Sequence, residues 1–334
     1  MSTAGADADR SAALLPGVSS VSTPVVSLVI CTRGRSDRLS ATATRARAAL
    51  DGCVGPDGPL LAELVLVDNG TPSEVEKELS DDVRADPRVR VVNAQVPGLS
   101  RARAVGCAAS RGDIVVMTDD DVEVDAGWLG RMASPVLRGQ GDLVAGRVRL
   151  AADTRYPVDA RLRRWLAETD DDGEPHVVGA ALAFRRDVLG AALWDPALGA
   201  GAPGTGFGED VLFEWMAVAH GARLVRAGGP PVIHRPDVDR LTRAAWIDAA
   251  VRRGRSDAYV AHHWLGTKVS FGGARWVRLA VLLAAHRLRG RVRSAAAAPT
   301  TRAVDPEELE LVRRLAQSRA LHGLRRAPRL YLRA

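Results

Sequence analysis

Short apolar runs alternate with segments of helical pattern along the first part of the chain. Four runs rich in valine, isoleucine and leucine have the length and composition of buried strands, at residues 25–32, 61–70, 88–94 and 112–121. Charged or small-residue segments typical of helices separate them, at residues 33–50, 73–83 and 98–110. Strands that alternate with helices predict an α/β fold with a mostly parallel sheet flanked by helices.

The pattern is looser in the second half. Residues 141–150 predict a strand that could run against the others, and residues 222–234 predict a short pair of strands ending at His234. Residues 198–210 are rich in glycine, which predicts a loop that bends closely around something. From about Leu241 onward the chain is predicted to be helical.

The predicted C-terminal helices are basic. From Arg235 onward there are 20 arginines and one lysine against eight acidic residues, a net charge of +13, so residues 1–234 carry −7. Such a tail could meet nucleic acid or an anionic membrane surface, or its arginines could be a solvated helical face. Residues 275–293 place an apolar stripe among six arginines, which an interfacial helix needs and which a helix packed on the catalytic domain would also show.

Composition narrows the class of protein. No run of 18 uninterrupted apolar residues occurs, so a transmembrane helix is not expected. Residues 1–24 lack the basic and hydrophobic regions of a secretory signal and are expected to be a disordered leader. The spacing of Cys31, Cys53 and Cys107 fits neither a zinc site nor a disulfide framework, which indicates reduced thiols and a cytoplasmic location.

Three consecutive aspartates, Asp119 to Asp121, follow the fourth apolar run. Adjacent carboxylates repel one another, so a run of three suggests a bound cation. Mg²⁺ or Mn²⁺ takes oxygen ligands and could tie a diphosphate to the protein. The alternative is an acidic surface turn. Thr32 with Arg33, and Asp68 with Asn69, also end predicted strands, so one edge of the sheet is expected to carry all these polar groups.

Four segments together resemble the family 2 glycosyltransferases of the GT-A fold, in order and spacing. They are SLVICTRGRSDRL, LVLVDNG, GLSRARAVGCAASRGDIVVMTDDDVEVDAGWL and GFGEDVLFEWMAVAHGARLVRAGGPPVIH. The resemblance covers about residues 25–265, as a catalytic domain, and leaves residues 266–334 as a basic helical extension. It implies an inverting, metal-dependent enzyme that moves a sugar from a nucleotide-diphosphate donor to an acceptor hydroxyl or other nucleophile.

The resemblance also implies roles for particular residues. Thr32 and Arg33 would line the nucleotide base, and Asp68 would bind its edge. Ala102, Arg103 and Ala104 occupy an Ala-Arg-Asn motif whose Asn is missing here. Nucleotide-sugar binding is therefore expected from Thr32, Arg33, Asp68, Arg103 and Asp120. The metal, Mn²⁺ or Mg²⁺, is expected on Asp119, Asp121 and His234.

The Glu209-Asp210 pair occupies the family's Glu-Asp motif. An acceptor hydroxyl must lose a proton as it attacks, and a carboxylate within hydrogen-bond reach can take it. Asp210 is the expected base, with Glu209 beside it. The alternative is a helix N-terminus, where acidic residues are common anyway.

Two other functions stay open from the sequence. One is a nucleotidylyltransferase on a related fold, which would need a glycine-rich basic loop where residues 32–38 have only a faint version. The other is a degenerate GT-A scaffold or peripheral membrane protein that acts through its tail. The leading expectation is a cytoplasmic enzyme, peripheral at the inner face of the cell membrane if the tail binds it. It has a glycan, lipid-linked, peptide or small-molecule acceptor and no nucleic-acid partner.

Overall fold

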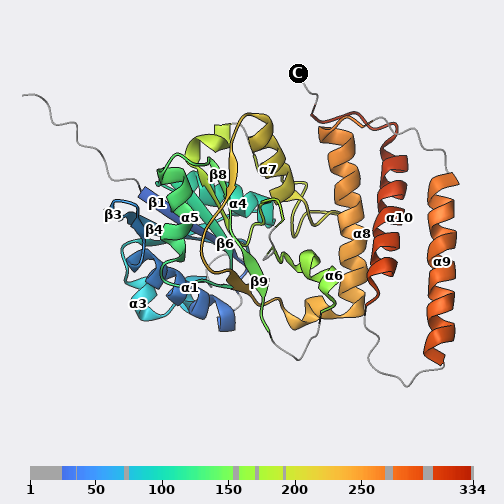
Figure 1. Ribbon diagram of the computed structural model, residues 1–334, viewed down its shortest axis with the longest axis horizontal. Coiled ribbons are helices and arrows are strands. Elements are labelled where there is room, and N and C mark those ends of the chain that lie inside the picture. The colour runs from blue at the N-terminus through green and yellow to red at the C-terminus, as the bar shows by residue number, and fades with distance from the viewer. Residues whose placement is uncertain are drawn as a thin grey trace, which may run out of the picture.

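A seven-stranded sheet forms the centre of the molecule (Figure 1). The computed structural model describes residues 25–34, 36–70, 75–152, 158–169, 173–190, 193–267, 274–295 and 304–331, and the leader expected at 1–24 lies outside them. The strand order is β11-β8-β10-β6-β1-β4-β5. The strands are β1 (Val25–Thr32), β4 (Leu61–Asp68), β5 (Val89–Asn93), β6 (Ile114–Asp119), β8 (Leu143–Ala145), β10 (Leu182–Arg185) and β11 (Leu224–Arg226).

The four strands expected in the first part of the chain are neighbours and run parallel, as predicted. Two smaller sheets accompany them. One pairs β2 (Val54–Gly55) with β3 (Gly58–Pro59), and the other has the order β7-β12-β9. Its members are β7 (Val122–Glu123), β9 (Val148–Leu150) and β12 (Val232–His234).

One expectation for the second half is wrong. Residues 141–150 form two strands in different sheets, and the strand that runs against its neighbours is β10. Residues 222–234 form the two short strands expected, the second ending at His234, and β11 joins the large sheet while β12 joins the small one. The chain changes sheet around Gly146, where a Cβ would lie 2.7 Å from the Cβ of Ala181, so the backbones approach more closely than a larger residue allows.

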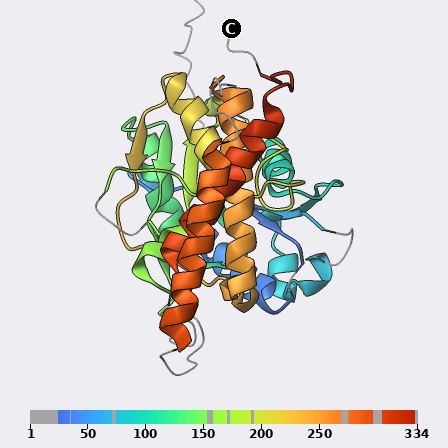
Figure 2. The same cartoon turned by 90° about the vertical axis from the view of Figure 1, so that its right-hand side faces the viewer.

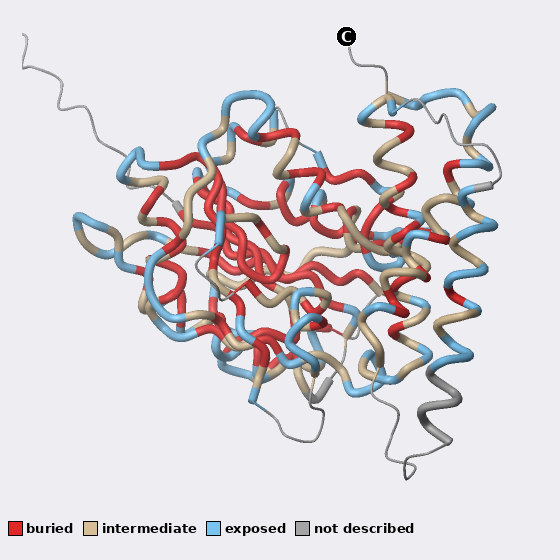
Figure 3. The backbone as a smooth tube through the Cα atoms, turned by 45° about the vertical axis from the view of Figure 1, so that its right-hand side comes forward, coloured by how far each residue is buried: buried red, intermediate tan, exposed pale blue. Residues whose placement is uncertain are grey.

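Helices cover both faces of the sheet. Successive side chains of a strand point to opposite faces, so Leu28 and Ile30 enter one core cluster while Val29 and Cys31 enter the other. The first cluster lies under α1 (Ser36–Asp51), α2 (Val75–Glu78), α3 (Asp81–Arg84) and α5 (Trp128–Leu137). The second lies under α4 (Leu99–Ala109) and α7 (Glu209–Ala219). Figure 3 shows the buried residues concentrated in these central strands.

Strand register gathers polar residues at one edge. Thr32 pairs with Asp68, Asp68 with Asn93, and Cys31 with Asp119, so the carboxyl ends of β1, β4, β5 and β6 lie level. This edge is the one predicted from the sequence. The order also reverses here, since β4 and β6 flank β1 on opposite sides, and ligands of open α/β sheets bind at such a point.

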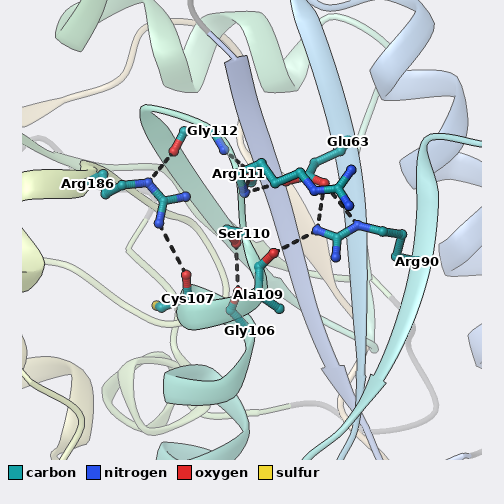
Figure 4. Close-up of polar contacts among 10 residues, drawn as sticks. Glu63, Arg90, Gly106, Cys107, Ala109, Ser110, Arg111, Gly112 and Arg186 are labelled. Carbon is teal, nitrogen blue, oxygen red and sulfur yellow. Dashed lines mark hydrogen bonds and ion pairs between the residues drawn. The ribbon is translucent and has the colours of Figure 1, made fainter.

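The opposite edge of the sheet carries a structural polar cluster (Figure 4). Oε1 of Glu63 accepts hydrogen bonds from Ser27 and from the Arg111 backbone N–H, and Oε2 accepts from Arg90 at 2.7 Å. Burial opposes ionisation, but these donors hold the pKa of Glu63 below its ordinary value. Its oxygens are occupied by the protein itself, which indicates a structural role.

A layer of helices lies beside the sheet. It contains α6 (Ala160–Arg163), α8 (Arg243–Tyr259), α9 (Ala274–Ala295) and α10 (Pro306–Leu324), with short turns η1 (Arg164–Leu166), η3 (Val238–Leu241) and the π-helical η4 (Val260–Trp264). The turn η2 (Arg186–Gly190) instead follows β10 and packs into the second core cluster through Val188. Asp305 caps α10 by accepting from the Glu307 N–H, as the sequence indicates. The domain boundary expected at residue 265 stays a prediction; α8, before it, packs along α10, after it.

The apolar residues of α9 divide between two faces. α8, α10 and α9 follow one another outward, so α9 faces the viewer in Figure 2. Trp276, Leu279 and Leu283 pack into the core of this helical layer. Val277, Val281 and Leu288 are 45%, 63% and 63% exposed. Packing therefore accounts for one side of the predicted stripe only. None of the helices described here is long and apolar enough to cross a bilayer.

Candidate active site

A buried arginine lies at the centre of the polar edge. Arg103 of α4 is 4% exposed. Its Nη1 donates to Oε1 of Glu209 at 2.7 Å, and its Nη2 donates to Oδ1 of Asp119 at 3.2 Å. A Cβ on Gly179 would lie 1.7 Å from Nη2, so only glycine leaves room for the guanidinium there. Arg103 thus joins the end of β6 to the start of α7.

The acidic side chains around Arg103 carry more charge than its guanidinium can offset. Burial alone would lower the pKa of Arg103, but Asp119, Glu209 and Asp210 surround it and raise the pKa above its ordinary value. Burial, and then repulsion from Asp210, raise the pKa of Glu209, although Arg103 opposes this. Three carboxylates around one guanidinium leave an excess of negative charge, which a cation or a proton would offset.

Asp210 lies beside this ion-pair network and is partly exposed. Its Oδ2 accepts from the backbone N–H of Gly179 at 3.2 Å, and its Oδ1 accepts from the N–H of Val211. Glu209 is 7% exposed and already bound by Arg103. Of the two acids in the motif, Asp210 is the one that an incoming hydroxyl can approach.

Asp121 and His234 form a second pair, on β7's side of the edge. Oδ2 of Asp121 lies 3.3 Å from Nε2 of His234 and 3.6 Å from Nη1 of Arg240. Nδ1 of His234 donates to the Leu166 carbonyl at 2.8 Å, which directs Nε2 toward Asp121. Burial opposes protonation, yet Asp121 raises the pKa of His234.

This pair fits a divalent cation in part. Two ligands of one cation, each at about 2.1 Å from it, lie within about 4.2 Å of each other, and Asp121 and His234 meet that condition. The predicted third ligand, Asp119, is bound to Arg103 instead. Among the described residues no cluster of three or more His, Cys, Asp or Glu side chains could hold a metal ion.

The other predicted residues line the same edge. Oγ1 of Thr32 donates to Oδ2 of Asp120 at 2.7 Å, so these two side chains bind each other. Asp68 is 4% exposed and accepts from the Gly70 N–H and from Asn93. Arg33 is exposed and lies against Gly201, where a Cβ would be 2.4 Å from its Nη2.

Comparison with known proteins identifies the domain. Residues 27–191 match the model of glycosyl transferase family 2. This part of the chain belongs to that family. The family 2 domain contains β1, β4, β5 and β6, together with Arg103 and the three aspartates.

Curated relatives match short stretches of the chain. The uncharacterized glycosyltransferase EpsJ of Bacillus subtilis is 32% identical over 101 residues, 30% of this chain and 29% of that protein. Mouse polypeptide N-acetylgalactosaminyltransferase 10 is 31% identical over 105 residues, 30% of this chain and 17% of that enzyme. The matches thus span less than a third of either relative.

Solved structures resemble the chain more distantly. Glucosyl-3-phosphoglycerate synthase from Mycobacterium tuberculosis, in complex with Mn²⁺, UDP and glucosyl-3-phosphoglycerate, has a TM-score of 0.44 and 20% identity, over 69% of this chain and 80% of that one. S. aureus TarS 1-349 has a TM-score of 0.46 and 14% identity, over 75% and 73%.

The polar edge of the sheet brings most of the expected residues together and adds Gly179 and Arg240. Glu209 and Asp210 lie outside residues 27–191, and Arg103 joins them to the family 2 domain. The sequence predicted that Arg103 binds the nucleotide. It indicated neither the contact of Gly179 with Arg103 nor that of Arg240 with Asp121. No local signal marks these contacts, because each joins residues far apart along the chain.

Replacing Arg103 with methionine should destabilise the fold by about 3–5 kcal/mol at pH 8, since the buried Glu209 and the partly exposed Asp119 lose their cation. The pKa of Glu209 is already raised and would rise further. Its ionisation therefore costs stability above the pKa of an unfolded glutamate, and the loss should shrink at pH 5. Chemical unfolding of both proteins at the two pH values measures this. If the loss of unfolding free energy is the same at pH 8 and at pH 5, the ionisation of Glu209 does not cause it.

Proposed function

We propose that this protein is an inverting glycosyltransferase that moves a sugar from a nucleotide-diphosphate donor to an acceptor hydroxyl or other nucleophile. The observation that carries the proposal is the Arg103 bridge. It places the acids after β6 and the acids that open α7 at the same edge of the sheet. Membership of residues 27–191 in glycosyl transferase family 2 supports the reaction class.

Asp210 is the proposed general base. As the acceptor oxygen attacks the anomeric carbon, its proton passes to Asp210, the new glycosidic bond forms, and the bond to the diphosphate breaks. One displacement at that carbon inverts it. The Gly179 and Val211 N–H groups orient the carboxylate. Arg103 binds Glu209 beside it, so that this second acid is not offered to the acceptor.

The donor is proposed to bind at the carboxyl ends of β1, β4 and β6. Asp68 would meet the base edge, and the exposed guanidinium of Arg33 can stack on the base. Thr32 and Asp120 shape the floor through their mutual hydrogen bond. Asp121 and His234 would hold Mn²⁺ or Mg²⁺, completed by Asp119 or by donor oxygens. When bound, that ion neutralises the leaving diphosphate.

Asp210→Asn should lower kcat by roughly 10²–10⁴, the scale of a lost general base, and leave nucleotide affinity unchanged. Glu214→Gln is a matched control on the same helix, since Glu214 also accepts a backbone N–H, from Val177 at 2.7 Å. Steady-state turnover of nucleotide sugars measures the effect. If Glu209→Gln stops turnover and Asp210→Asn does not, the base is the other acid.

Asp121→Asn should abolish the part of nucleotide binding that depends on Mn²⁺, because it removes the carboxylate that faces His234. Calorimetry with UDP, GDP and dTDP, with and without Mn²⁺, measures this. Asp125→Asn, at an exposed aspartate bound to Arg131, is the control. If nucleotide affinity depends equally on Mn²⁺ in wild type and in Asp121→Asn, other residues bind the metal. If nucleotide affinity in wild type does not depend on Mn²⁺, the result supports a scaffold.

The acceptor is proposed to be reached at an anionic membrane surface on the cytoplasmic side. α9 contains six arginines and no acidic residue. Val277, Val281 and Leu288 are spaced to share one helical face and are exposed. Exposed Arg278 and Arg289 lie beside that face. An apolar face bordered by arginine suits the surface of a bilayer with anionic lipid. The three cysteines, buried as free thiols, suit the cytoplasm.

Val281→Asp with Leu288→Asp should reduce sedimentation with vesicles containing anionic lipid by about tenfold or more, since binding scales with buried apolar area. High salt should release the wild type, because the arginine attraction is screened. Leu61→Asp is the control: Leu61 is as exposed as these two, at 63%, but lies on β4. Equal sedimentation of wild type and the double variant would leave α9 with a packing role only.

A further inference from the structure

Asp195 is a buried carboxylate away from the ion-pair network. It is 0% exposed. Its Oδ2 accepts from the hydroxyl of Tyr259 at 3.0 Å and from Nε1 of Trp264 at 2.8 Å, and its Oδ1 accepts from the Ala197 N–H at 2.9 Å. These donors are neutral, and burying a carboxylate among neutral groups is costly unless its oxygens are satisfied. Such an arrangement needs an explanation beyond packing.

The residue before Asp195 contacts the Arg103 network. Trp194 stacks on Phe213 of α7, with ring centroids 4.4 Å apart and planes 8° apart. The Cζ of Arg103 lies 5.2 Å from the Trp194 ring centroid. A displacement of Asp195 would therefore be felt by both the arginine and the helix that begins with Glu209 and Asp210.

α8 also fastens the far end of the glycine-rich loop. Oγ of Ser256 accepts from the N–H groups of Gly206 and Phe207, each at 3.3 Å, and Arg252 donates to the Thr205 carbonyl. In between, the loop contacts Arg33 through Gly201. Residues 195–208 are thus held at both ends by one helix and its extension, directly before the proposed base.

The donors to Asp195 lie on an uncommon piece of helix. Tyr259 ends α8, and Trp264 ends the π-helical turn η4. Such turns are rare and often occur at functional sites. Burial and the nearby Asp195 raise the pKa of Tyr259, so its hydroxyl stays protonated and can donate. Both residues lie outside residues 27–191, so the matched family region does not include them.

We propose that Asp195 is a positioning residue: with Tyr259 and Trp264 it fixes the glycine-rich loop, and through Trp194 it sets where Asp210 meets the acceptor. The inference rests on the proposed function. The proposal predicts different effects on nucleotide binding and on transfer to the acceptor. Of the proposed nucleotide contacts, Asp68 and Asp121 lie on other elements, and Arg33 touches the loop at Gly201. Loss of the Asp195 contacts should therefore lower turnover far more than nucleotide binding.

Tyr259→Phe removes one of these hydrogen bonds, and Asp195→Asn replaces one acceptor oxygen with an NH₂ group that faces at least one N–H or O–H donor. We expect kcat to fall by about tenfold and about a hundredfold, the range for hydrogen bonds to a charged group. The affinity for UDP, GDP or dTDP with Mn²⁺ should stay within about twofold, by calorimetry. Ser110→Ala is the matched control, since it removes a buried hydroxyl that donates to the Gly106 carbonyl at 2.7 Å, at the opposite edge of the sheet.

Three outcomes distinguish a failure of the positioning role from a failure of the proposed function. If the wild type is active and kcat is unchanged in Tyr259→Phe and Asp195→Asn, the positioning role is overturned. A fall in kcat that is equally large in Ser110→Ala also overturns it. Wild type without turnover of any donor overturns the proposed function. Amide hydrogen exchange of residues 196–208 then decides the positioning role by itself. It should speed up in Asp195→Asn and stay unchanged in Ser110→Ala, and unchanged exchange in both contradicts the inference.

Discussion

One buried guanidinium holds the polar edge of this molecule together. Arg103 donates hydrogen bonds to Asp119 at the end of β6 and to Glu209 at the start of α7, and Gly179 leaves room for the guanidinium. A buried ion pair contributes little net stability, but breaking one is costly, because the remaining charge stays buried. The arrangement therefore specifies geometry. It fixes where α7 begins relative to the sheet, and with it the position of Asp210.

Much of the central sheet could be predicted from the sequence, and the reason is local. β1, β4 and β6 are short, mostly apolar runs, and parallel strands buried on both faces have that pattern. β5, at the edge of the sheet, is only partly buried. The carboxyl ends of these four strands carry the polar residues, so the polar edge follows from the register. The strands after residue 141 are harder to predict from the sequence, because the bend at Gly146 depends on its contact with Ala181, which is far along the chain.

The sequence predicts that the polar side chains lie at one edge of the sheet, but it does not predict which residue each of them contacts. Asp119, Asp120 and Asp121 are consecutive, yet they face Arg103, Thr32 and His234 respectively. Successive side chains leave a strand in different directions, and which partner each meets is set by the tertiary fold. The same holds for Asp195, Tyr259 and Trp264, whose only sequence signal is that they are polar or aromatic. Predicting such contacts requires knowing where α8 lies.

The most direct measurement of this account is the coupling between Arg103 and Glu209 in unfolding free energy. Arg103→Met, Glu209→Gln and the double variant form a double-mutant cycle. Removing Arg103 leaves Glu209 buried without its cation, and removing the Glu209 charge leaves Arg103 with its hydrogen bond to Asp119. The account therefore predicts that the double variant loses less stability than the two single losses added together, by about 2–3 kcal/mol. Additivity to within about 0.5 kcal/mol would mean that Arg103 does not join α7 to β6, and the positioning of Asp210 would need another cause.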